Sequence, residues 1–171
     1  LGLRHGHAIA GDDDDLLSLF EHESRVICAA LLVGASLARF AALCAVFCAE
    51  ERLAALAMRA GAALVTPEVA DHLFLGPLDS AEILTRVSCG SDLYPETGAT
   101  LLIEAGIGRG QGLRLSGPGV DGTVEIAVDG LPDGFWATRR AVMRYPMGIE
   151  MFLLDGARVL GLPRSTDIEV L

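Results

Sequence analysis

The 171 residues fit one domain of ordinary size, large enough to bury a continuous core without disulfides or a structural metal. Hydrophobic residues make up 51% of the chain, which excludes an intrinsically disordered protein. The formal net charge of -10 repels phosphate backbones, so nucleic acid is not an expected partner.

The first part of the chain has the pattern of a helical region. Four aspartates at positions 12–15 precede an apolar run, which favours a helix start because carboxylates are stabilised at the positive end of the helix dipole. We expect this helix to break near Gly34 and a second helix to run from Ser36 to Gly61. The apolar residues that recur at helical spacing in the second helix are Phe40, Leu43, Phe47 and Leu53.

After Gly61 the pattern changes to short apolar runs separated by Gly, Pro and Asp, which is typical of strands and tight connections. Short strands are expected at residues 62–65 and 72–75. A short helix is expected at residues 79–87, with Asp79 as its cap.

A glycine-rich stretch separates two strand-like runs, at residues 100–105 and 112–116. The pair is expected to form a hairpin with a flexible connection. The connecting glycines are Gly106, Gly108 and Gly110. A dinucleotide-binding loop is the alternative, but such a loop opens a helix, whereas a strand is expected here.

The last third is expected to contain a strand at residues 123–128, a helix at 135–144 and two strands at 148–154 and 158–162. The helix should turn Phe135, Trp136, Val142 and Met143 towards the core and end at Tyr145-Pro146. A turn at Asp155-Gly156 joins the two strands, and an extended piece closes the chain at Leu171. Together these elements predict an α/β fold in which a mixed β-sheet is flanked by helices.

Residues 26–49 have the length of a membrane span and few polar interruptions. Arg39 lies near the middle of this stretch, where an arginine costs roughly 2.5 to 3.5 kcal/mol on insertion. A buried helical pair is therefore preferred over a span. Membrane association remains the alternative, and no membrane is expected as a partner.

The four cysteines have mostly apolar neighbours and none of the dense spacing of a secreted disulfide scaffold; they are Cys28, Cys44, Cys48 and Cys89. Reduced thiols in a cytoplasmic protein are expected, and the pattern at the start of the sequence predicts no signal peptide. Cys44 and Cys48 lie four apart on the expected helix, but no partner pair has matching spacing. Buried thiols are preferred over a zinc site, and no metal is expected.

All thirteen basic residues are arginines. A Schiff base with pyridoxal phosphate and the nucleotide loop G-x-x-x-x-G-K-[ST] both need a lysine amine. The sequence therefore argues against both classes of enzyme, and we expect no cofactor.

Four ordered segments in the second half resemble those of the PhnH family of the bacterial carbon-phosphorus lyase system. The segments are PETGATL at 95–101, LRLSGPGV at 113–120, YPMGIE at 145–150 and LPRST at 162–166. The resemblance is strongest over residues 55–171. Residues 1–54 are divergent, because RFAAL at 39–43 stands where the family has a T-P-V-W-L strand.

This resemblance implies a fold similar to that of pyridoxal-phosphate-dependent transferases, but without the cofactor, as one domain over residues 1–171. It implies a homodimer in a core complex with the PhnG, PhnI and PhnJ subunits. Together with the G, I and L subunits, the family acts in forming ribose 1-phosphonate 5-triphosphate from ATP and an alkylphosphonate. Because nucleosidase chemistry belongs to the I subunit, a non-catalytic or site-completing role in this transferase complex is implied.

Arg164 is the side chain best suited to hold a phosphate or a partner's carboxylate, because its planar fork makes paired charge-assisted hydrogen bonds. A salt bridge at the core edge or an interface is the alternative. If Arg164 binds substrate, its replacement by alanine weakens nucleotide or phosphonate binding and leaves assembly intact. The candidate binding residues are Arg164, Ser165, Thr166, Ser116, Gly117 and Gly119, the last three forming either an anion-binding nest or a simple turn.

No triad, nucleophile elbow or carboxylate pair can be assigned in the sequence, so no catalytic residue is named. An autonomous enzyme or binding protein for a small phosphorylated metabolite, acting at Arg164 and Gly117, is the alternative function. Three side chains are candidates for either partner contact or core packing, namely Trp136, Tyr145 and Met147.

Overall fold

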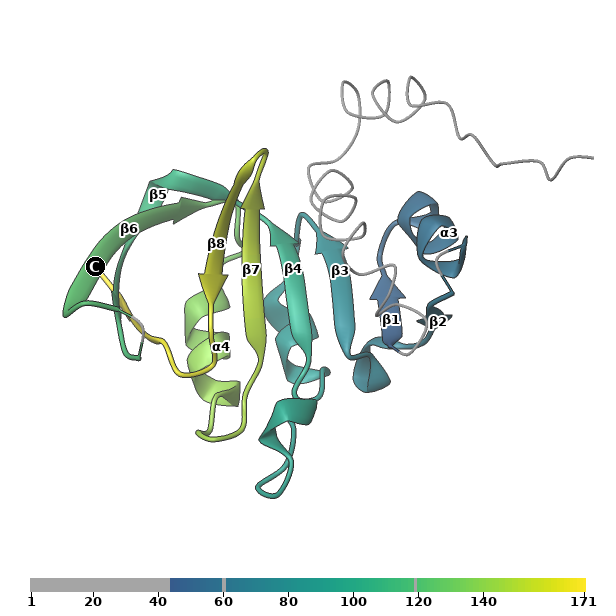
Figure 1. Ribbon diagram of the computed structural model, residues 1–171. Helices are drawn as coiled ribbons and strands as arrows, with labels where there is room; N and C mark the ends of the chain where they lie inside the picture. Colours follow the sequence, from purple (N-terminus) through teal and green to yellow (C-terminus); the bar gives the residue numbers. More distant parts are fainter. Residues whose placement is uncertain (1–43, 60, 119) are drawn as a thin grey trace, which may run out of the picture.

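The computed structural model describes residues 44–59, 61–118 and 120–171 (Figure 1), so the predictions for residues 1–43 lie outside the described part. In this part the strands form two sheets, a larger one and a smaller one that curves beside it. Helices pack beside both sheets. The fold is therefore mixed α/β, as the sequence predicts.

The larger sheet has the strand order β2-β1-β3-β4-β7-β8. All its neighbouring strands are parallel except β7 and β8, which form an antiparallel hairpin at one edge. Its strands are β1 (Ala45–Cys48), β2 (Ala63–Leu64), β3 (His72–Gly76), β4 (Thr100–Glu104), β7 (Glu150–Asp155) and β8 (Arg158–Leu162).

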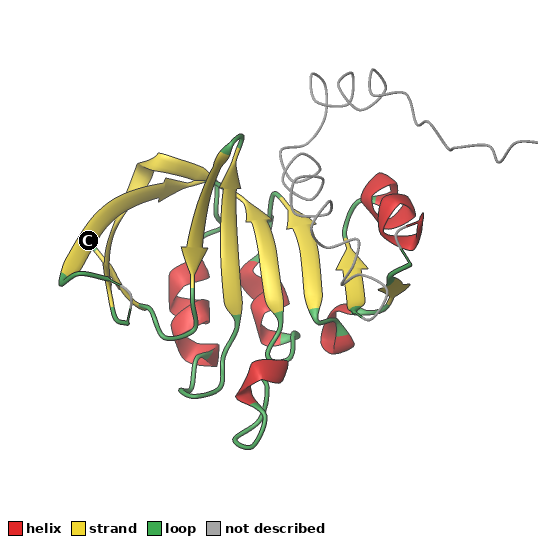
Figure 2. Cartoon of the chain, in the orientation of Figure 1, coloured by secondary structure: helices red, strands yellow, loops and turns green. Residues whose placement is uncertain are grey.

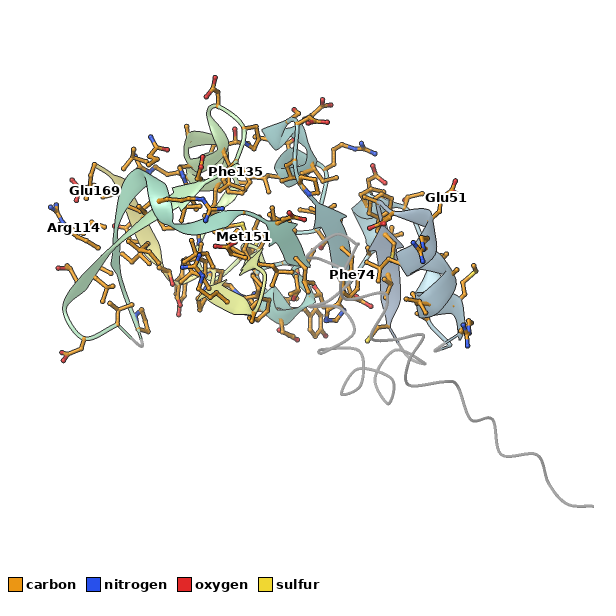
Figure 3. The ribbon with its side chains drawn as sticks, turned by 90° about the horizontal axis from the view of Figure 1, so that it is seen from above. Glu51, Phe74, Arg114, Phe135, Met151 and Glu169 are labelled. Carbon is orange, nitrogen blue, oxygen red and sulfur yellow. The ribbon has the colours of Figure 1, made fainter. Side chains whose placement is uncertain are left out.

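The smaller sheet is antiparallel, with the order β6-β5-β9. Its strands are β5 (Gly106–Ser116), β6 (Thr123–Asp129) and β9 (Asp167–Val170). Arg114 on β5 forms ion pairs with both neighbours, at 3.0 Å to Glu125 and 2.8 Å to Glu169. Figure 3 shows Arg114 and Glu169 together at the end of the molecule opposite Glu51.

The central strands are apolar on both faces, as expected for a parallel sheet covered on two sides. On β4, Leu101, Leu102 and Ile103 are 0%, 4% and 0% exposed. Leu101 and Ile103 belong to the main core cluster, which also includes Leu73, Leu113, Phe135, Met151 and Leu153. Leu102 belongs to a smaller cluster on the other face, with Val46, Leu53, Phe74 and Leu154.

Two α-helices and three short 3₁₀ helices lie among the described residues (Figure 2). They are α3 (Glu51–Arg59), α4 (Phe135–Val142), η2 (Pro67–Val69), η3 (Ala81–Thr85) and η4 (Pro95–Thr97). The helix α4 contacts η3 and β9 and places Phe135 and Trp136 in the core. The helix α3 buries Leu53 in the smaller cluster beside β1 and β2.

Most of the predicted elements after Gly61 are confirmed to within about two residues. The confirmed elements are the strands β2, β3, β4, β6, β7 and β8, the helix α4 and the closing strand β9. The turn at Asp155-Gly156 is also present, with Gly156 in the left-handed region at a φ of 61°. The N-terminal end of η3 differs from the prediction, in which Asp79 was the cap. Ser80 caps it instead, because its side chain accepts a hydrogen bond from the Glu82 N–H at 3.2 Å.

The prediction of one helix from Ser36 to Gly61 is wrong over its described part. Residues 45–48 form β1, and the helix begins only at Glu51. Helical spacing placed Phe47 and Leu53 on one face, but they pack on opposite sides of the larger sheet. The pairing of β1 with β2 and β3 outweighs the local helical pattern here. The end of the helix is as predicted, because Gly61 has a φ of 89°.

The predicted hairpin between residues 100–105 and 112–116 is also wrong. The strand β4 pairs with β3 and β7 in the larger sheet, whereas β5 pairs with β6 and β9 in the smaller one. The glycines lie within β5, where its register with β6 shifts between Ile107 and Gln111. Gly108 and Gly110 both have a φ of 87°, which only glycine adopts without strain. They therefore form a bulge inside one strand.

In the described ranges, no helix has both the length and the apolar character that crossing a membrane requires. The stretch at 26–49 was expected to form a buried helical pair, but its described end contains the strand β1. Cys44 and Cys48 pack against the smaller core cluster. Among the described residues, no three His, Cys, Asp or Glu side chains come together as metal ligands.

Candidate functional site

A cavity of about 460 Å³ lies between α4, the segment before β9 and the turn after β5. Its volume is within the range of small-molecule sites in proteins. It combines a cluster of arginines with an apolar wall. The lining residues are Pro118, Trp136, Arg139, Arg140, Met143, Tyr145, Arg164, Ser165, Thr166, Asp167 and Ile168.

The structure brings three of the six sequence-predicted binding residues to this cavity and places two more next to its lining segment. Arg164, Ser165 and Thr166 line it directly. Gly117 lies against the same segment, since an added Cβ would come within 2.6 Å of the Ser165 carbonyl oxygen. Ser116 pairs with Asp167 across β5 and β9. Gly119 lies outside the described residues.

The guanidinium of Arg164 links two other segments to the cavity wall. Its Nε lies 2.5 Å from Glu150 Oε1, and its main-chain N–H donates to Glu150 Oε2 at 2.9 Å. Its Nη1 donates to the Pro95 carbonyl oxygen. Three of the four motif segments thus meet at one side chain. These bonds support the alternative in which Arg164 forms a structural salt bridge. Through them Arg164 fixes the position of the cavity wall.

Arg139 is the most deeply buried charged group of the cavity, with 4% of the residue exposed. Its Nη1 and Nη2 donate to the carbonyl oxygens of Thr166 and Pro163, at 3.3 and 3.1 Å. Its Nε is buried without a hydrogen-bond partner. Burial lowers the pKa of Arg139 to about 10, although the negative charges of Asp167 and Glu150 oppose this shift. Arg139 therefore stays protonated at neutral pH.

Arg140, the next residue of α4, donates from Nη2 to the Ile168 carbonyl oxygen at 2.9 Å. This residue is exposed, in contrast to Arg139. The two arginines hold α4 against the segment at 163–168 through main-chain carbonyls only. Three arginines and one carboxylate, Asp167, line the cavity, so positive charge predominates there although the chain has a net charge of -10.

The sequence contained a signal for the burial of Arg139 that the prediction missed. Arg139 lies four residues after Phe135 and three after Trp136, on the face that was expected to enter the core. An arginine on the buried face of an amphipathic helix is rare without a structural or binding role. Its partners come from the last segment of the chain and were not predictable from local pattern.

The three candidates for partner contact have different positions. Trp136 is buried and forms an edge-to-face pair with Phe135, with ring centroids 5.1 Å apart. Met147 is half-buried. Tyr145 is 81% exposed and is the clearest candidate for contact with another protein.

A second cavity, of about 420 Å³, is also lined by Trp136. It is lined partly by Asp129, Asp133 and the start of α4.

The glycine bulge of β5 is followed by the strand β6 and not by a helix, so the arrangement does not fit a dinucleotide-binding loop.

A carboxylate with 6% of its side chain exposed joins the two sheets near this bulge. Asp155 accepts hydrogen bonds from the Ile107 main-chain N–H at 3.1 Å, from Arg109 Nη1 at 3.4 Å and from Arg158. The Ile107 hydrogen bond, and then the contributions of Arg158 and Arg109, hold the pKa of Asp155 below its ordinary value. The ionised form is therefore favoured in the folded chain.

This shift predicts a loss of stability in acid. A carboxyl group with a lowered pKa stabilises the fold above its unfolded pKa of about 3.9, and this contribution is lost as the pH falls through the folded value. In thermal unfolding scans from neutral pH downwards, Asp155→Asn should be less stable than the wild type at pH 7. The difference should shrink below about pH 4. An unchanged difference at all pH values would contradict this role of Asp155.

Comparison with known proteins identifies the family to which this chain belongs. The family model described as bacterial phosphonate metabolism protein (PhnH) matches residues 21–169. The alpha-D-ribose 1-methylphosphonate 5-triphosphate synthase subunit PhnH of Rhizobium meliloti is 40% identical over 88 residues, which cover 49% of this chain and 43% of the relative.

A second relative is HtxG of Stutzerimonas stutzeri, whose name describes it as a C-P lyase subunit protein. It is 36% identical over 83 residues, which cover 47% of this chain and 43% of the relative. The matches thus span less than half the length of both curated relatives. The family model nevertheless covers most of the chain, so this protein belongs to the PhnH family of bacterial phosphonate metabolism proteins.

Proposed function

We propose that the chain is a non-catalytic or site-completing subunit of the carbon-phosphorus lyase core complex. Together with G, I and L subunits, it would be needed to form ribose 1-phosphonate 5-triphosphate from ATP and an alkylphosphonate. The observation that carries this proposal is the family match over residues 21–169. Both relatives, in addition, are named as subunits.

The chemistry of the cavity supports a role in binding and positioning. Its charged donors are arginines, and even the buried Arg139 has a pKa of about 10. Such groups remain protonated at neutral pH and are poor proton donors, but they attract and orient anions. We propose that Arg164, Ser165, Thr166, Ser116, Gly117 and Gly119 contribute to this binding region, with Arg164 fixing the position of its wall.

The proposed partners are PhnG, PhnI and PhnJ subunits and a second copy of the chain. Exposed apolar residues at one end of the larger sheet support a protein interface, because aromatic residues are enriched in interface cores. They are Leu93 and Tyr94 before η4 and Tyr145 before β7. The two loops that carry them are joined by the hydrogen bond from the Gly148 N–H to the Cys89 carbonyl oxygen, at 2.9 Å.

This interface predicts that Tyr145→Ala weakens assembly without affecting the fold. Because 81% of Tyr145 is exposed, the change in unfolding free energy should stay within about 0.5 kcal/mol. Recovery of the variant with tagged partner subunits should fall at least severalfold in a co-purification. Val159→Ala, a substitution at an exposed residue of β8, is the control and should be recovered like the wild type. Equal recovery of Tyr145→Ala would contradict the interface.

The proposal also includes the location, the domain organisation and the fold relationship that the sequence led us to expect. We propose a cytoplasmic location, a single domain over residues 1–171, and no membrane or nucleic-acid partner. We also propose a relationship to the fold of pyridoxal-phosphate-dependent transferases, without the cofactor. The predominantly parallel larger sheet and the lack of lysine are compatible with that relationship.

Growth on a phosphonate tests the proposed function. A bacterium that lacks its own PhnH-family protein would receive this chain with the partner subunits of the chain's own organism. With methylphosphonate as the only phosphorus source, we expect growth to return, and to be lost again when this chain is omitted. Expression of the folded chain without restored growth would overturn the proposed function.

The arginine-lined cavity also supports the second candidate, an autonomous enzyme or binding protein for a small phosphorylated metabolite. Conversion of such a metabolite by the isolated chain, without partner subunits, would favour this candidate. The subunit role is preferred because both curated relatives are named as subunits.

A further inference from the structure

The larger sheet has a second apolar face, opposite the face that packs against α4. On this second face Phe74, Leu102 and Leu154 belong to the smaller core cluster and are 7%, 4% and 1% exposed. Leu102 and Leu154 lie on β4 and β7, and neighbouring strands leave the side chains of a sheet face uncovered. A sheet face that is buried to this degree needs a covering layer.

The helices among the described residues do not account for this layer over β4 and β7. The helix whose residues enter the smaller cluster is α3, through Leu53 and Ala57, and it contacts β1 and β2. In the strand order of the larger sheet, β7 lies three strands from β1, about 14 Å away. Figure 1 shows α3 beside β1 and β2, at the end of the sheet away from β7. The cover over β4 and β7 must therefore have another source.

Residues 26–43 have the composition, length and position that such a cover requires. All but Gly34, Ser36 and Arg39 are apolar. The stretch ends directly before Cys44, which packs against the smaller cluster and precedes β1. Its 18 residues would span about 27 Å even as a helix, which is enough to cross from β1 to β7. The family model begins at residue 21, so the stretch belongs to the same family unit as the sheet.

We propose that residues 26–43 pack against the second face of the larger sheet and cover Leu102 and Leu154. This contact goes beyond the proposed function, because it completes the core of the chain whether or not the chain joins a complex. It assigns the apolar stretch to the protein interior instead of a membrane. Partner subunits would then meet the chain at other surfaces, such as the loop that carries Tyr145.

Phe152 marks the rim of the second face. It lies two residues before Leu154 on β7, on the same side of the sheet, and 41% of it is exposed. Its ring lies beside the edge strand β8, since a Cβ added at Gly161 would come within 3.4 Å of Phe152 Cε1. A probe at this position therefore reports what lies next to the covered residues and leaves the buried ones intact.

Photo-cross-linking from position 152 of the full chain tests the contact. The variant carries p-benzoylphenylalanine in place of Phe152, and mass spectrometry identifies the linked peptide. We expect a link to residues 26–43 of the same molecule. The same amino acid in place of Val124 is the control and should give no such link, because Val124 is 49% exposed on β6 of the smaller sheet.

The mass of the cross-linked product distinguishes the possible occupants of the second face. A link within one chain keeps the mass of one chain, whereas a link to a second copy doubles it. A doubled mass would show that a second copy occupies this face and would overturn the proposal. The absence of any link between position 152 and residues 26–43 would overturn it as well.

Two cysteines of the same molecule provide a second readout. Cys48 packs against the smaller cluster, whereas Cys89 packs against the main core cluster. Burial raises the pKa of Cys48 to about 11, so its thiol is protonated and slow to react at neutral pH. In the double variant Phe40→Asp and Leu43→Asp, two carboxylates disturb the apolar cover, and a maleimide should label Cys48 at least tenfold faster.

Cys89 is the internal control in this experiment and should keep its wild-type labelling rate. An unchanged rate for Cys48 would overturn the proposal. Equal acceleration at both cysteines would show that the double variant does not fold. The cross-link from position 152 then decides the question, because it needs no substitution in the cover.

Discussion

Gly98→Ala is expected to destabilise the chain by about 3 kcal/mol, the upper part of the usual range for overpacking. An added Cβ would lie 2.2 Å from the carbonyl oxygen of Gly148, which is a main-chain atom and unable to rotate away. The Gly148 N–H is held at 2.9 Å by the Cys89 carbonyl oxygen, so the two loops cannot separate without losing a hydrogen bond. Urea unfolding followed by circular dichroism measures the change.

Gly122→Ala is the matched control for this substitution. Gly122 has a φ of 69°, but no atom lies within 4 Å of an added Cβ. The control should therefore show only the strain of the left-handed conformation, about 1 to 2 kcal/mol. Similar losses at the two positions would contradict the close approach of the two loops.

Arg164→Ala is expected to lower the free energy of unfolding by about 3 kcal/mol. The substitution leaves Glu150 without its ion pair and Pro95 without its hydrogen-bond donor. The estimate is at the low end for buried ion pairs, because 19% of the Arg164 side chain and 29% of the Glu150 side chain are exposed. Chemical unfolding of the wild type and the variant at neutral pH gives the difference.

Arg86→Ala breaks an exposed pair with Glu68 and is the control, with an expected cost of about 1 kcal/mol or less. The double variant of Arg164 and Glu150 should lose less than the sum of the single variants. Equal costs for Arg164→Ala and Arg86→Ala would show that Arg164 does not hold the motif segments together. Because Arg164 also supports the fold, Arg140 is the better position for testing ligand binding.

The elements that sequence patterns predicted well are those in which local and tertiary forces agree. The three central residues of the strand Thr100–Glu104 are apolar, and they pack into core clusters on both faces of β4. The helix Phe135–Val142 follows a turn at Gly134 and buries the aromatic residues that its spacing indicates. In such segments the local pattern already contains the information that the fold uses.

The two wrong predictions concern segments whose partners are distant in the chain. Ala45–Cys48 has no clear strand pattern, and its structure depends on pairing with β2 and β3. The glycines after β4 suggested a hairpin, although the chain crosses there from one sheet to the other. Short-range patterns do not reveal which of two sheets a strand joins.

The candidate site was predicted in part. The motif resemblance selected Arg164, Ser165 and Thr166, which line the cavity. It did not select Arg139 and Arg140, because these residues belong to a helix outside the four motif segments. Their relation to the site depends on contacts between α4 and the segment at 163–168, which only the three-dimensional structure shows.

Co-expression of the chain with PhnG, PhnI and PhnJ subunits from its own organism tests the proposed subunit role most directly. The partners would be purified by a tag on one of them, and the mass of the intact assembly would be measured. The proposed role predicts that the chain is recovered in a complex in stoichiometric amounts. Recovery of the folded chain only by itself, while the partners assemble without it, would contradict that role.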